Sequence, residues 1–467
     1  MSTLSPKERM AIPRVAMPEQ AAARRVTNFN EVNQGLEASL AVREAQRCLE
    51  CRAKPCVAGC PVRVRIPEFL ARVAAGDFAA AAEILRADNA LPATTGRVCP
   101  QERQCEAQCV RGKGAGQSVA IGWLERFVAD WAQANLERPS PPAVRTGKRV
   151  AVIGSGPGGL TAAGELARLG HDVTILEALH APGGVLRYGI PEFRLPKAIV
   201  DAEIENLRAL GVQLECNVVV GRTVTLSQLR QEYDACFIAN GAGLPTFLRV
   251  PGENLKGVYS ANEYLTRVNL MGAWRANSRT PVVRGKTAVV FGGGNVAMDA
   301  VRTARRMGSE RAVIAYRRGK SELPARVEEV HHAEHEGVEF LLQVAPLELL
   351  GDDKGWVRAV RLQRMELGAP DASGRRRPVP VPGSEFELEC DLAVVAVGTS
   401  PNPLLTASCP ELATDKDGSI LVDDNLMTSL PGVFAGGDIV RGGATVILAM
   451  GDGKQAAAGI HKFLSAT

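Results

Sequence analysis

Eleven cysteines are distributed unevenly along this chain of 467 residues, and their spacing points to iron–sulfur chemistry. The first four form the pattern C-x2-C-x4-C-x3-C-P, which is close to the cysteine run of bacterial ferredoxins. Zinc sites usually combine one CxxC pair with a second CxxC or with HxxxH, which is a different spacing. Seven cysteines lie in the first quarter of the chain: Cys48, Cys51, Cys56, Cys60, Cys99, Cys105 and Cys109.

The four thiols of this run are not expected to bind one cluster. In ferredoxin-type runs the cysteine before the proline ligates the other cluster, which separates Cys60 from its three neighbours. Cys48, Cys51 and Cys56 therefore need a fourth ligand from elsewhere. Seven thiols leave one position of two four-iron clusters without a cysteine, and that position calls for another kind of donor.

The later cysteines give no sign of disulfide chemistry. Cys216, Cys236, Cys390 and Cys409 are single, and no CxxC or CxxxxC pair follows residue 109. A disulfide reductase would carry such a pair beside its flavin, so the sequence argues against that activity.

A glycine-rich loop at residues 154–159 is typical of dinucleotide binding. Gly154-Ser-Gly156-Pro-Gly-Gly159 follows the apolar run RVAVI and opens a helix. The first glycine permits the tight turn, the second lets backbone approach a pyrophosphate, and the third lets helix and strand pack closely. The next expected strand ends at Glu177, which is suitably placed for a ribose hydroxyl.

A second loop of the same kind begins 138 residues later, with Gly292, Gly294 and, in the third position, Ala297. Its second strand ends in Tyr-Arg317-Arg318, where NAD-binding proteins carry an acidic residue. Two guanidinium groups suit the 2′-phosphate of NADP, so the sequence favours NADP. The alternative is a pair of arginines that face only solvent.

A third nucleotide signal lies near the C-terminus, in GVFAGGDIVRGGATVILAMGDGK. Asp438 follows a strand and a double glycine, as does the carboxylate on the ribityl–phosphate side of FAD in many flavoenzymes. After two dinucleotide loops this motif favours FAD. His331 and His335 share a helix face, but no third ligand is nearby, and we expect a solvated helix there.

Composition and charge exclude several classes of protein. The net charge of +4 is too small to argue for nucleic-acid binding. No apolar run approaches the length of a membrane span, and the N-terminus has no secretory signal, so we expect a cytoplasmic protein. Residues 1–149 hold 22 Lys and Arg against 15 Asp and Glu, which is +7, and the remainder holds about −3. A basic first part suits an acidic partner or an internal anionic cofactor.

The elements that position these residues are predicted to form an α/β protein with an all-α first part. Helical periodicity in 66–89 and 119–136 predicts a helical iron–sulfur domain over 1–145, followed by a Pro-rich linker. Strand–glycine–helix units predict two nested Rossmann-like domains: FAD over 146–280 and 391–467, and NADP(H) over 281–390. Residues 357–390 alternate like an antiparallel meander.

The sequence resembles the small (β) subunit of NADPH-dependent glutamate synthase and its relatives over essentially the whole chain. These relatives include the large subunit of NADH-dependent ferredoxin:NADP oxidoreductase and the N-terminal half of dihydropyrimidine dehydrogenase. The matching stretches include RCLEC, CVAGCPV, TGRVCPQERQCEAQCV, GSGPGGL, YGIPEFRLPK, FGGGNVAMDAVRTA and FAGGDIVRGGATVILAMGDGK. The resemblance implies a glutathione-reductase-like pair of FAD and NADPH domains and two [4Fe-4S] clusters.

The resemblance also implies the residues of each site. One cluster would be held by Cys48, Cys51, Cys56 and Cys109, and the other by Cys60, Cys99, Cys105 and a non-cysteine ligand. Relatives that use Gln or Glu as this ligand place it in the helix AIGWLERFVADW, at the position of Glu125; a solvated carboxylate is the alternative. The implied nucleotide contacts are Gly154, Gly156, Gly159, Glu177, Gly184 and Asp438 for FAD, and Gly292, Gly294, Asn295, Ala297, Arg317 and Arg318 for NADPH.

The implied reaction is electron transfer from NADPH through FAD and the clusters to a partner subunit, in a hetero-oligomer. The hydride step needs no acid–base residue, so no catalytic side chain is predicted. The first expectation is the small subunit of glutamate synthase, with its large subunit as partner. The alternatives are a bifurcating ferredoxin:NADP oxidoreductase, with ferredoxin and a [2Fe-2S] flavoprotein subunit as partners, or the electron-input part of a dihydropyrimidine dehydrogenase.

Overall fold

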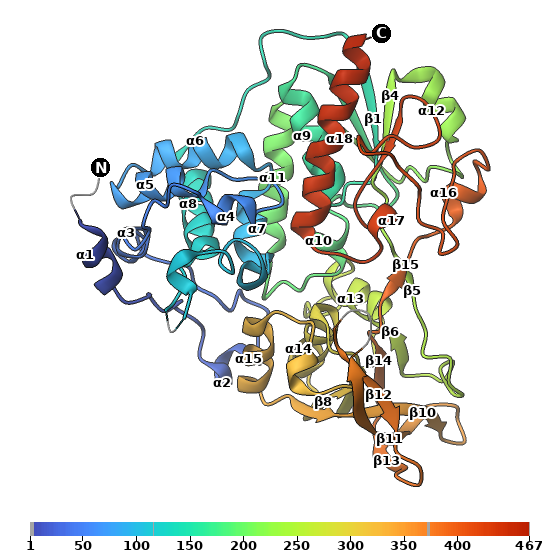
Figure 1. Cartoon of the computed structure of the whole chain (residues 1–467). Helices are drawn as coiled ribbons and strands as arrows, with labels where there is room; N and C mark the ends of the chain where they lie inside the picture. Colours follow the sequence, from blue (N-terminus) through green and yellow to red (C-terminus); the bar gives the residue numbers. More distant parts are fainter. Residues whose placement is uncertain (1–3, 115, 371–373, 467) are drawn as a thin grey trace.

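Helices form the first part of the chain, which lies beside two parallel β-sheets (Figure 1). The computed structural model describes residues 4–114, 116–370 and 374–466. Its N-terminal helices are α1 (Pro6–Ala11), α2 (Ala22–Arg25), α3 (Ala38–Ala45), α4 (Pro55–Ala58), α5 (Ile66–Ala74), α6 (Phe78–Asp88), α7 (Pro92–Val98) and α8 (Ile121–Asn135), with 3-10 turns at Gln101–Arg103 and Val110–Gly112. The cysteines lie mainly in the irregular segments between these helices.

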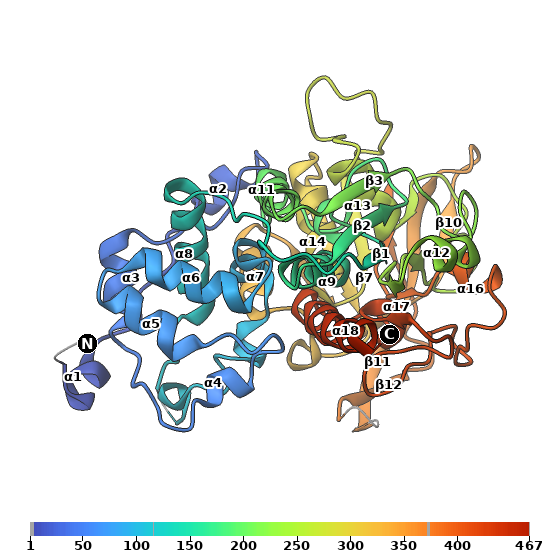
Figure 2. The same ribbon diagram turned by 90° about the horizontal axis from the view of Figure 1, so that it is seen from above.

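The first sheet is parallel, in the order β16-β4-β1-β2-β3. Helices α9, α11 and α18 lie on the side of this sheet that faces the helical part (Figures 1 and 2). The strands are β1 (Arg149–Ile153), β2 (Asp172–Glu177), β3 (Gln213–Cys216), β4 (Ala235–Ile238) and β16 (Val433–Ala435). The helices of this part are α9 (Pro157–Arg168), α10 (Val185–Tyr188), α11 (Lys197–Ala209), α12 (Leu226–Glu232), α16 (Leu404–Ala407), α17 (Asp438–Arg441) and α18 (Val446–Ala466).

The second sheet is also parallel, in the order β6-β14-β7-β8-β9. Its strands are β6 (Val258–Ser260), β7 (Thr287–Phe291), β8 (Arg311–Tyr316), β9 (Glu339–Leu342) and β14 (Leu392–Val395). Its helices are α13 (Ala261–Asn269), α14 (Asn295–Arg306) and α15 (Val327–His335), with a 3-10 turn at Lys320–Glu322. Two nearly equivalent Rossmann-like units therefore follow the helical part, and the predicted fold class is confirmed.

An antiparallel extension leaves the second sheet, as the alternating pattern of 357–390 predicted. It consists of β10 (Val344–Gly351), β11 (Val357–Pro370), β12 (Arg376–Pro380) and β13 (Phe386–Glu389), with β11 pairing all three others. The chain passes between the two Rossmann-like units along β5 (Leu244–Pro245) and β15 (Thr399–Ser400), which pair antiparallel.

The boundaries between these units differ from the predicted ones at two strands. The sequence assigned 146–280 and everything from 391 onward to the first unit, whereas β6 and β14 both belong to the second sheet. The crossings therefore lie after β4 and after β14. A short buried strand such as β14 has the same apolar pattern in either parallel sheet, so its local sequence does not show to which sheet it belongs.

The helical part shares an apolar core with the first sheet. One continuous cluster joins Leu70 of α5 and Val128 of α8 to Leu160 of α9 and Met450 of α18. The second sheet has separate clusters on its two faces. The iron–sulfur domain of the prediction is thus packed onto the first Rossmann-like unit rather than being an independent globule.

A segment near the N-terminus, residues 19–33, reaches away from the helical part and crosses the second unit; we call it the strap. The backbone N–H of Val32 donates to the carbonyl of Phe193, at 2.9 Å. The ring of Phe29 stacks on Trp274, with centroids 5.0 Å apart. Through these contacts the strap covers the junction between the two Rossmann-like units.

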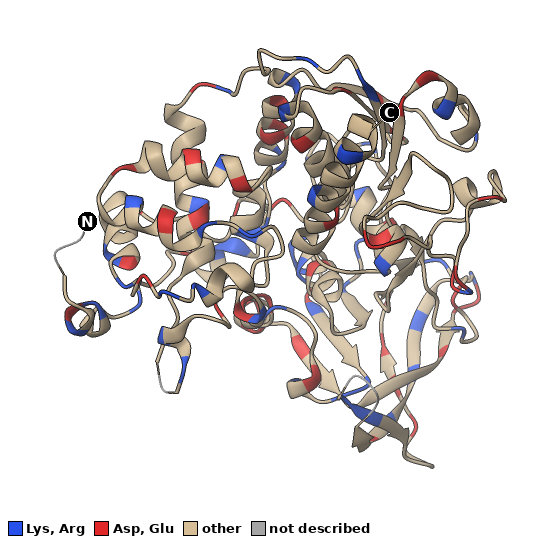
Figure 3. Cartoon of the chain, turned by 45° about the horizontal axis from the view of Figure 1, so that its top comes forward, with Lys and Arg blue, Asp and Glu red and all other residues tan. Residues whose placement is uncertain are grey.

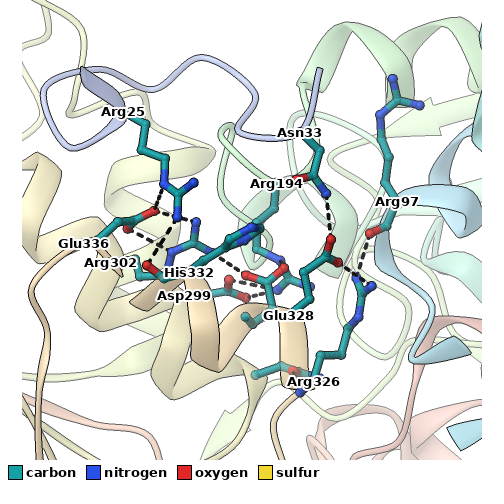
Figure 4. A network of polar contacts seen from close by, with 12 residues as sticks. Arg25, Asn33, Arg97, Arg194, Asp299, Arg302, Arg326, Glu328, His332 and Glu336 are labelled. Carbon is teal, nitrogen blue, oxygen red and sulfur yellow. Dashed lines mark hydrogen bonds and ion pairs between the residues drawn. The ribbon is translucent and has the colours of Figure 1, made fainter. Parts of the chain in front are cut away.

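Buried ion pairs continue the strap into the second unit (Figure 4). Arg25 of the strap donates to Glu336, at 2.9 Å, and both side chains are almost inaccessible to solvent. Arg194 of the first unit pairs with Asp299 of α14, at 2.7 Å. In the part of this network around Glu336 and Asp299, four arginines pair with four carboxylates: Arg25, Arg194, Arg302 and Arg306 with Glu19, Asp299, Glu329 and Glu336.

Candidate functional site: a nucleotide cavity beside two thiol groups

One cavity of about 1930 Å³ extends between the two Rossmann-like units. A pocket for one small ligand usually measures about 300–1,000 Å³, so this cavity is large enough for two nucleotides. Its wall includes both predicted glycine loops and both predicted carboxylates, Glu177 and Asp438. Residues far apart in the sequence are thus brought to one space at the carboxyl ends of the strands, where α/β sheets bind ligands.

The first glycine loop has the geometry that a bound pyrophosphate requires. Gly154 has a φ of +101°, and a Cβ there would lie 2.6 Å from the carbonyl oxygen of Ala239. A Cβ at Gly159 would lie 2.0 Å from the oxygen of Gly154, so the helix packs directly on the turn. Gly156 caps α9 and faces open space. Gly184, with a φ of +52°, packs against Gly156, since a Cβ at 184 would lie 2.8 Å from its Cα.

The two carboxylates of the first unit have different environments. Glu177 is buried at the end of β2 and accepts hydrogen bonds from the N–H groups of Ser155, at 3.0 Å, and Leu179, at 2.8 Å. It therefore tightens the glycine turn from the side on which the ribose is expected. Asp438 lines the cavity and accepts a hydrogen bond from the N–H of Ala444, while burial raises its pKa.

The second glycine loop repeats the first one closely. Gly292 has a φ of +140°, and a Cβ there would lie 2.3 Å from the oxygen of Ala396 and 3.4 Å from the Cβ of Ala297. Gly294 caps α14, next to open space. The side-chain oxygen of Asn295 accepts a hydrogen bond from the N–H of Arg326, at 2.9 Å, so it anchors a neighbouring loop as well as lining the cavity.

The two predicted phosphate-binding arginines are not equivalent. Both line the cavity directly after β8, but Arg317 is exposed to it and Arg318 is only 6% exposed. The Nε of Arg318 donates to the backbone carbonyl of Arg376, at 2.9 Å. Arg318 thus holds the start of β12, a role that the sequence did not reveal.

The seven N-terminal thiols fall into two groups. Cys48 and Cys56 lie close to Cys109, and Cys51 lies close to Cys56; burial, with a smaller contribution from these neighbours, raises the pKa of Cys48 to about 12 and that of Cys56 to about 11. The other group contains Cys60, Cys99 and Cys105, which lie close to one another; burial raises the pKa of all three. The ligand sets that the family resemblance implied divide the seven thiols in the same way, and ligation itself stays a prediction.

Glu125 of α8 lies beside the second thiol group. Cys60, Cys99 and Cys105 all lie close enough to be influenced by its charge. Its Oε1 accepts hydrogen bonds from Asn89 and from Thr95, both at 2.7 Å, while burial raises its pKa to about 7. The alternative of a solvated surface carboxylate is wrong, because Glu125 is on the buried face of the helix.

The environment of Glu125 fits a metal ligand. Buried carboxylates are normally paired with a cation or bound to a metal. Among the described residues no Lys, Arg or His contributes to its pKa or donates a hydrogen bond to it. A cluster iron beside Cys60, Cys99 and Cys105 would supply the missing positive charge. In the described part of the chain, no three Cys, His, Asp or Glu side chains form a group that could hold a single metal ion.

The second thiol group adjoins the nucleotide cavity. Val98 and Pro100, the neighbours of Cys99, line the cavity wall. Pro61, next to Cys60, packs against Gly451 of α18, where a Cβ would lie 3.3 Å from its carbonyl oxygen. The first group is farther toward the surface, since Arg52 and Lys54 in its loop are exposed.

The helical part keeps most of its positive charge on its surface, although a few of its arginines are buried in ion pairs. Acidic and basic residues are interspersed along it (Figure 3). Arg47 pairs with Glu44 at 2.5 Å, and Arg97 pairs with Glu31 at 2.8 Å, in each case with a nearly inaccessible guanidinium. In residues 1–149, 13 Lys and Arg are exposed against 7 Asp and Glu, so the surface of this part has the basic character that charge counting predicted.

Sequence reasoning missed several residues that organise the site. Asp452 of α18 accepts a hydrogen bond from the N–H of Gly437, at 2.9 Å, and pairs with Arg441, at 2.6 Å, which fixes the turn that carries Asp438. The sequence around Asp452, Gly-Asp-Gly-Lys within a long helix, gave no indication of this contact. His331 and His335 of α15 are exposed.

Comparison with family models identifies both parts of the chain. Residues 25–137 match the model described as dihydropyrimidine dehydrogenase domain II, 4Fe-4S cluster. Residues 148–453 match the model described as pyridine nucleotide-disulphide oxidoreductase. No helix in the described residues is long and apolar enough to cross a membrane.

Relatives match nearly the whole chain. The glutamate synthase [NADPH] small chain of Azospirillum brasilense is 39% identical over 96% of this chain and 95% of its own length. The putative oxidoreductase AegA of Escherichia coli is 39% identical over 99% of this chain and 72% of its own length. The NADP(+)-dependent formate dehydrogenase subunit beta of Moorella thermoacetica is 41% identical over 88% of this chain and 60% of its own.

Solved structures share the fold of the Rossmann-like units. FprA of Mycobacterium tuberculosis, in complex with NADPH, has a TM-score of 0.58 at 23% identity and covers 68% of this chain and 85% of its own. The chain belongs to the pyridine nucleotide-disulphide oxidoreductase family and carries an N-terminal domain of the 4Fe-4S family model. It belongs to the family of the glutamate synthase small chain, and is an NADPH-dependent flavin and iron–sulfur oxidoreductase with FAD, NADPH and [4Fe-4S] cofactors.

Proposed function

We propose that this chain is the electron-input subunit of a larger cytoplasmic enzyme, most simply the small subunit of a glutamate synthase. Electrons from NADPH enter at the cavity and leave one at a time through two [4Fe-4S] clusters to a partner subunit. The observation that carries the proposal is the order of the parts: cavity, then the thiols of Cys60, Cys99 and Cys105, then the thiols nearer the surface.

The residues of the cavity have the positioning roles that this reaction requires. FAD would supply the conversion between the hydride of NADPH and single electrons. Gly156 and Gly294 offer open helix N-termini for the two pyrophosphates, and Glu177 and Asp438 are placed for the FAD ribose and ribityl side. No side chain is required to accept or donate a proton in the hydride step.

The thiol groups have separate roles in the proposal. Cys60, Cys99, Cys105 and Glu125 hold the cluster that receives electrons at the cavity wall. Cys48, Cys51, Cys56 and Cys109 hold the cluster from which they leave the subunit. This assignment is supported by the two groups of neighbours and by the buried carboxylate of Glu125.

The identity of the partner is tested by anaerobic purification of the native complex. A copurifying large subunit that makes glutamate from glutamine and 2-oxoglutarate would support the glutamate synthase assignment. The chain alone should make no glutamate, because the wall of its described cavity carries the two dinucleotide-binding loops. Glutamate synthesis by the partner-free chain would contradict an electron-input role.

A second candidate has the same internal electron route and another partner. The match to a formate dehydrogenase subunit at 41% identity is as strong as the match to glutamate synthase chains. In this candidate the chain would work with ferredoxin and a [2Fe-2S] flavoprotein subunit, as in ferredoxin:NADP oxidoreductases. A small flavoprotein in the purified complex would favour it over glutamate synthase.

A further inference from the structure

The antiparallel extension contributes an arginine to the nucleotide cavity. Arg375 comes directly before β12 and lines the same cavity as Arg317 and Arg318, although 58 residues separate Arg375 from Arg317. Arg375 and Arg317 are both exposed. Two arginines from different elements therefore line the same part of the cavity, at the end of β8, where the adenosine ribose of a bound dinucleotide is expected.

The backbone that carries Arg375 is fixed against the loop after β8. The Nε of Arg318 donates to the carbonyl of Arg376, at 2.9 Å, and the Nε of Arg376 donates to Glu322, at 3.0 Å. The backbone carbonyl of Glu322 in turn accepts a hydrogen bond from the hydroxyl of Tyr316, at 2.9 Å. These contacts join β8, the turn after it and β12 into one unit, so Arg375 is held beside the end of β8.

We propose that Arg375 and Arg317 together bind the 2′-phosphate of NADPH, and that Arg318 acts mainly by positioning Arg375 through Arg376. A dianionic phosphate can accept hydrogen bonds from two guanidinium groups at once, and such charge-assisted bonds are stronger than neutral ones. This inference rests on the proposed placement of NADPH at the second glycine loop. It adds a specificity residue from the extension, which no motif of the Rossmann-like unit contains.

Arg375→Ala should weaken binding of 2′,5′-ADP by about 10- to 100-fold, the usual cost of one lost charge-assisted contact. Binding of 5′-ADP, which lacks the 2′-phosphate, should be unchanged. The full-length holoprotein would be titrated calorimetrically with each ligand under anaerobic conditions. In steady-state assays the same variant should raise KM for NADPH by a similar factor and leave KM for NADH as it is.

The arginine run 375–377 provides a matched control. Arg377 is also exposed but does not line the cavity. Arg377→Ala removes the same charge from the same hairpin, so both ligands should bind it as they bind the wild type. Arg375→Lys should retain part of the discrimination, because one cation remains.

The outcomes separate this inference from the function on which it rests. A wild-type chain that binds 2′,5′-ADP no better than 5′-ADP would contradict the NADPH assignment of the loop itself. A discriminating wild type with an equally discriminating Arg375→Ala variant would overturn the role of Arg375. Equal weakening of both ligands in that variant would also overturn it, since damage to the fold would act on both.

Discussion

Glu125 illustrates how a single residue can be assigned from its surroundings. The carboxylate is buried beside three thiols, accepts hydrogen bonds only on Oε1 from the described residues, and has no cation among them. Such a group in an apolar helix face would be costly without a further partner. Under the proposed ligation, an iron atom of the second cluster would remove this cost.

We expect Glu125→Ala to lose or perturb the second cluster while the FAD and the first cluster remain. Iron should fall from about eight toward about four atoms per chain, since a [4Fe-4S] cluster needs a complete set of ligands. Glu125→Gln keeps an oxygen donor and should retain more iron. Iron analysis and EPR of the reduced protein would measure this, with Glu83→Ala on the exposed side of α6 as control. Full iron and unchanged spectra in Glu125→Ala would contradict ligation.

Glu203 of α11 joins the two domains and should make their stability depend on pH. Its carboxylate accepts hydrogen bonds from the N–H groups of Ala93, at 2.7 Å, and Thr94, at 3.2 Å, at the start of α7. Burial raises its pKa from 4.5 to about 7. Below pH 4.5 the group is protonated in both folded and unfolded chains. As pH rises toward 7, ionisation favours the unfolded chain, so its contribution to stability is lost.

Glu203→Gln should therefore remove part of the pH dependence of unfolding. The stability of the wild type relative to this variant should fall by about 2–3 kcal/mol between pH 5 and pH 8, because one pKa unit corresponds to about 1.4 kcal/mol. Urea unfolding across this range measures the difference. Glu205→Gln, a change at a partly exposed position on the same helix, should keep the wild-type profile. Parallel profiles for wild type and Glu203→Gln would show that Glu203 does not titrate in this window.

At the residue scale, glycine spacing predicted the two loops of the cavity wall but few of the residues that hold the wall in place. Gly154 and Gly292 are visible in the sequence because each motif lies within one strand–turn–helix unit. Arg375 and Asp452 were invisible because each acts together with another element: Arg375 lines the cavity with Arg317, 58 residues earlier, and Asp452 of α18 pairs with Arg441 of α17. The two thiol groups came from a family resemblance, since spacing alone left the fourth ligands open.

At the scale of elements, the strap connects the helical part to the NADPH-binding unit. Arg25 reaches Glu336, which also accepts Arg302 and Arg306. One carboxylate thus forms ion pairs with three buried guanidinium groups from two elements. No sequence pattern marks residues 19–33 as structural, because an irregular segment obtains its order from distant contacts.

Within this network Glu336→Gln should be more destabilising than Arg25→Ala. Breaking a buried ion pair costs about 3–5 kcal/mol when an unpaired charge remains. Without Glu336 this is the situation of Arg306, whereas Arg25 keeps Glu19 and Arg302 keeps Glu329. After Arg25→Ala, Glu336 keeps two partners, so we expect a loss of about 1–3 kcal/mol. Arg24→Ala, at an exposed neighbour, should have little effect. Thermal and urea unfolding of the three variants test the order, and a larger loss for Arg25→Ala would contradict it.

The strands β6 and β14 show where element prediction failed. β14 was readable as a short buried strand, but its sheet depends on its pairing with β7, and β6 joins that sheet only by pairing with β14. In contrast, the long alternating run of β11 predicted its own antiparallel partners, since one face of that sheet is apolar. Period and length are local properties, whereas sheet membership is not.

At the scale of the whole molecule, the iron–sulfur domain and the first Rossmann-like unit are one packing unit. The Nζ of Lys454 in α18 donates to the carbonyls of Val62 and Asp88, at 3.1 and 2.8 Å, and one apolar cluster runs through both parts. The second unit has its own core. The proposed electron transfer from flavin to cluster would benefit from this division, because both sites would lie in parts that share one apolar core.

This division predicts an uneven response to the loss of iron. Ligands that bind only the folded chain stabilise it, so removing the clusters with a chelator under oxidising conditions should destabilise the helical part. Because that part shares its core with the first unit, hydrogen exchange should accelerate in α9 and α18 as well as in α5 and α8. Strands β7 and β8 should keep their protection, and 2′,5′-ADP should still bind. Faster exchange confined to residues 38–135 would show instead that the helical domain unfolds alone.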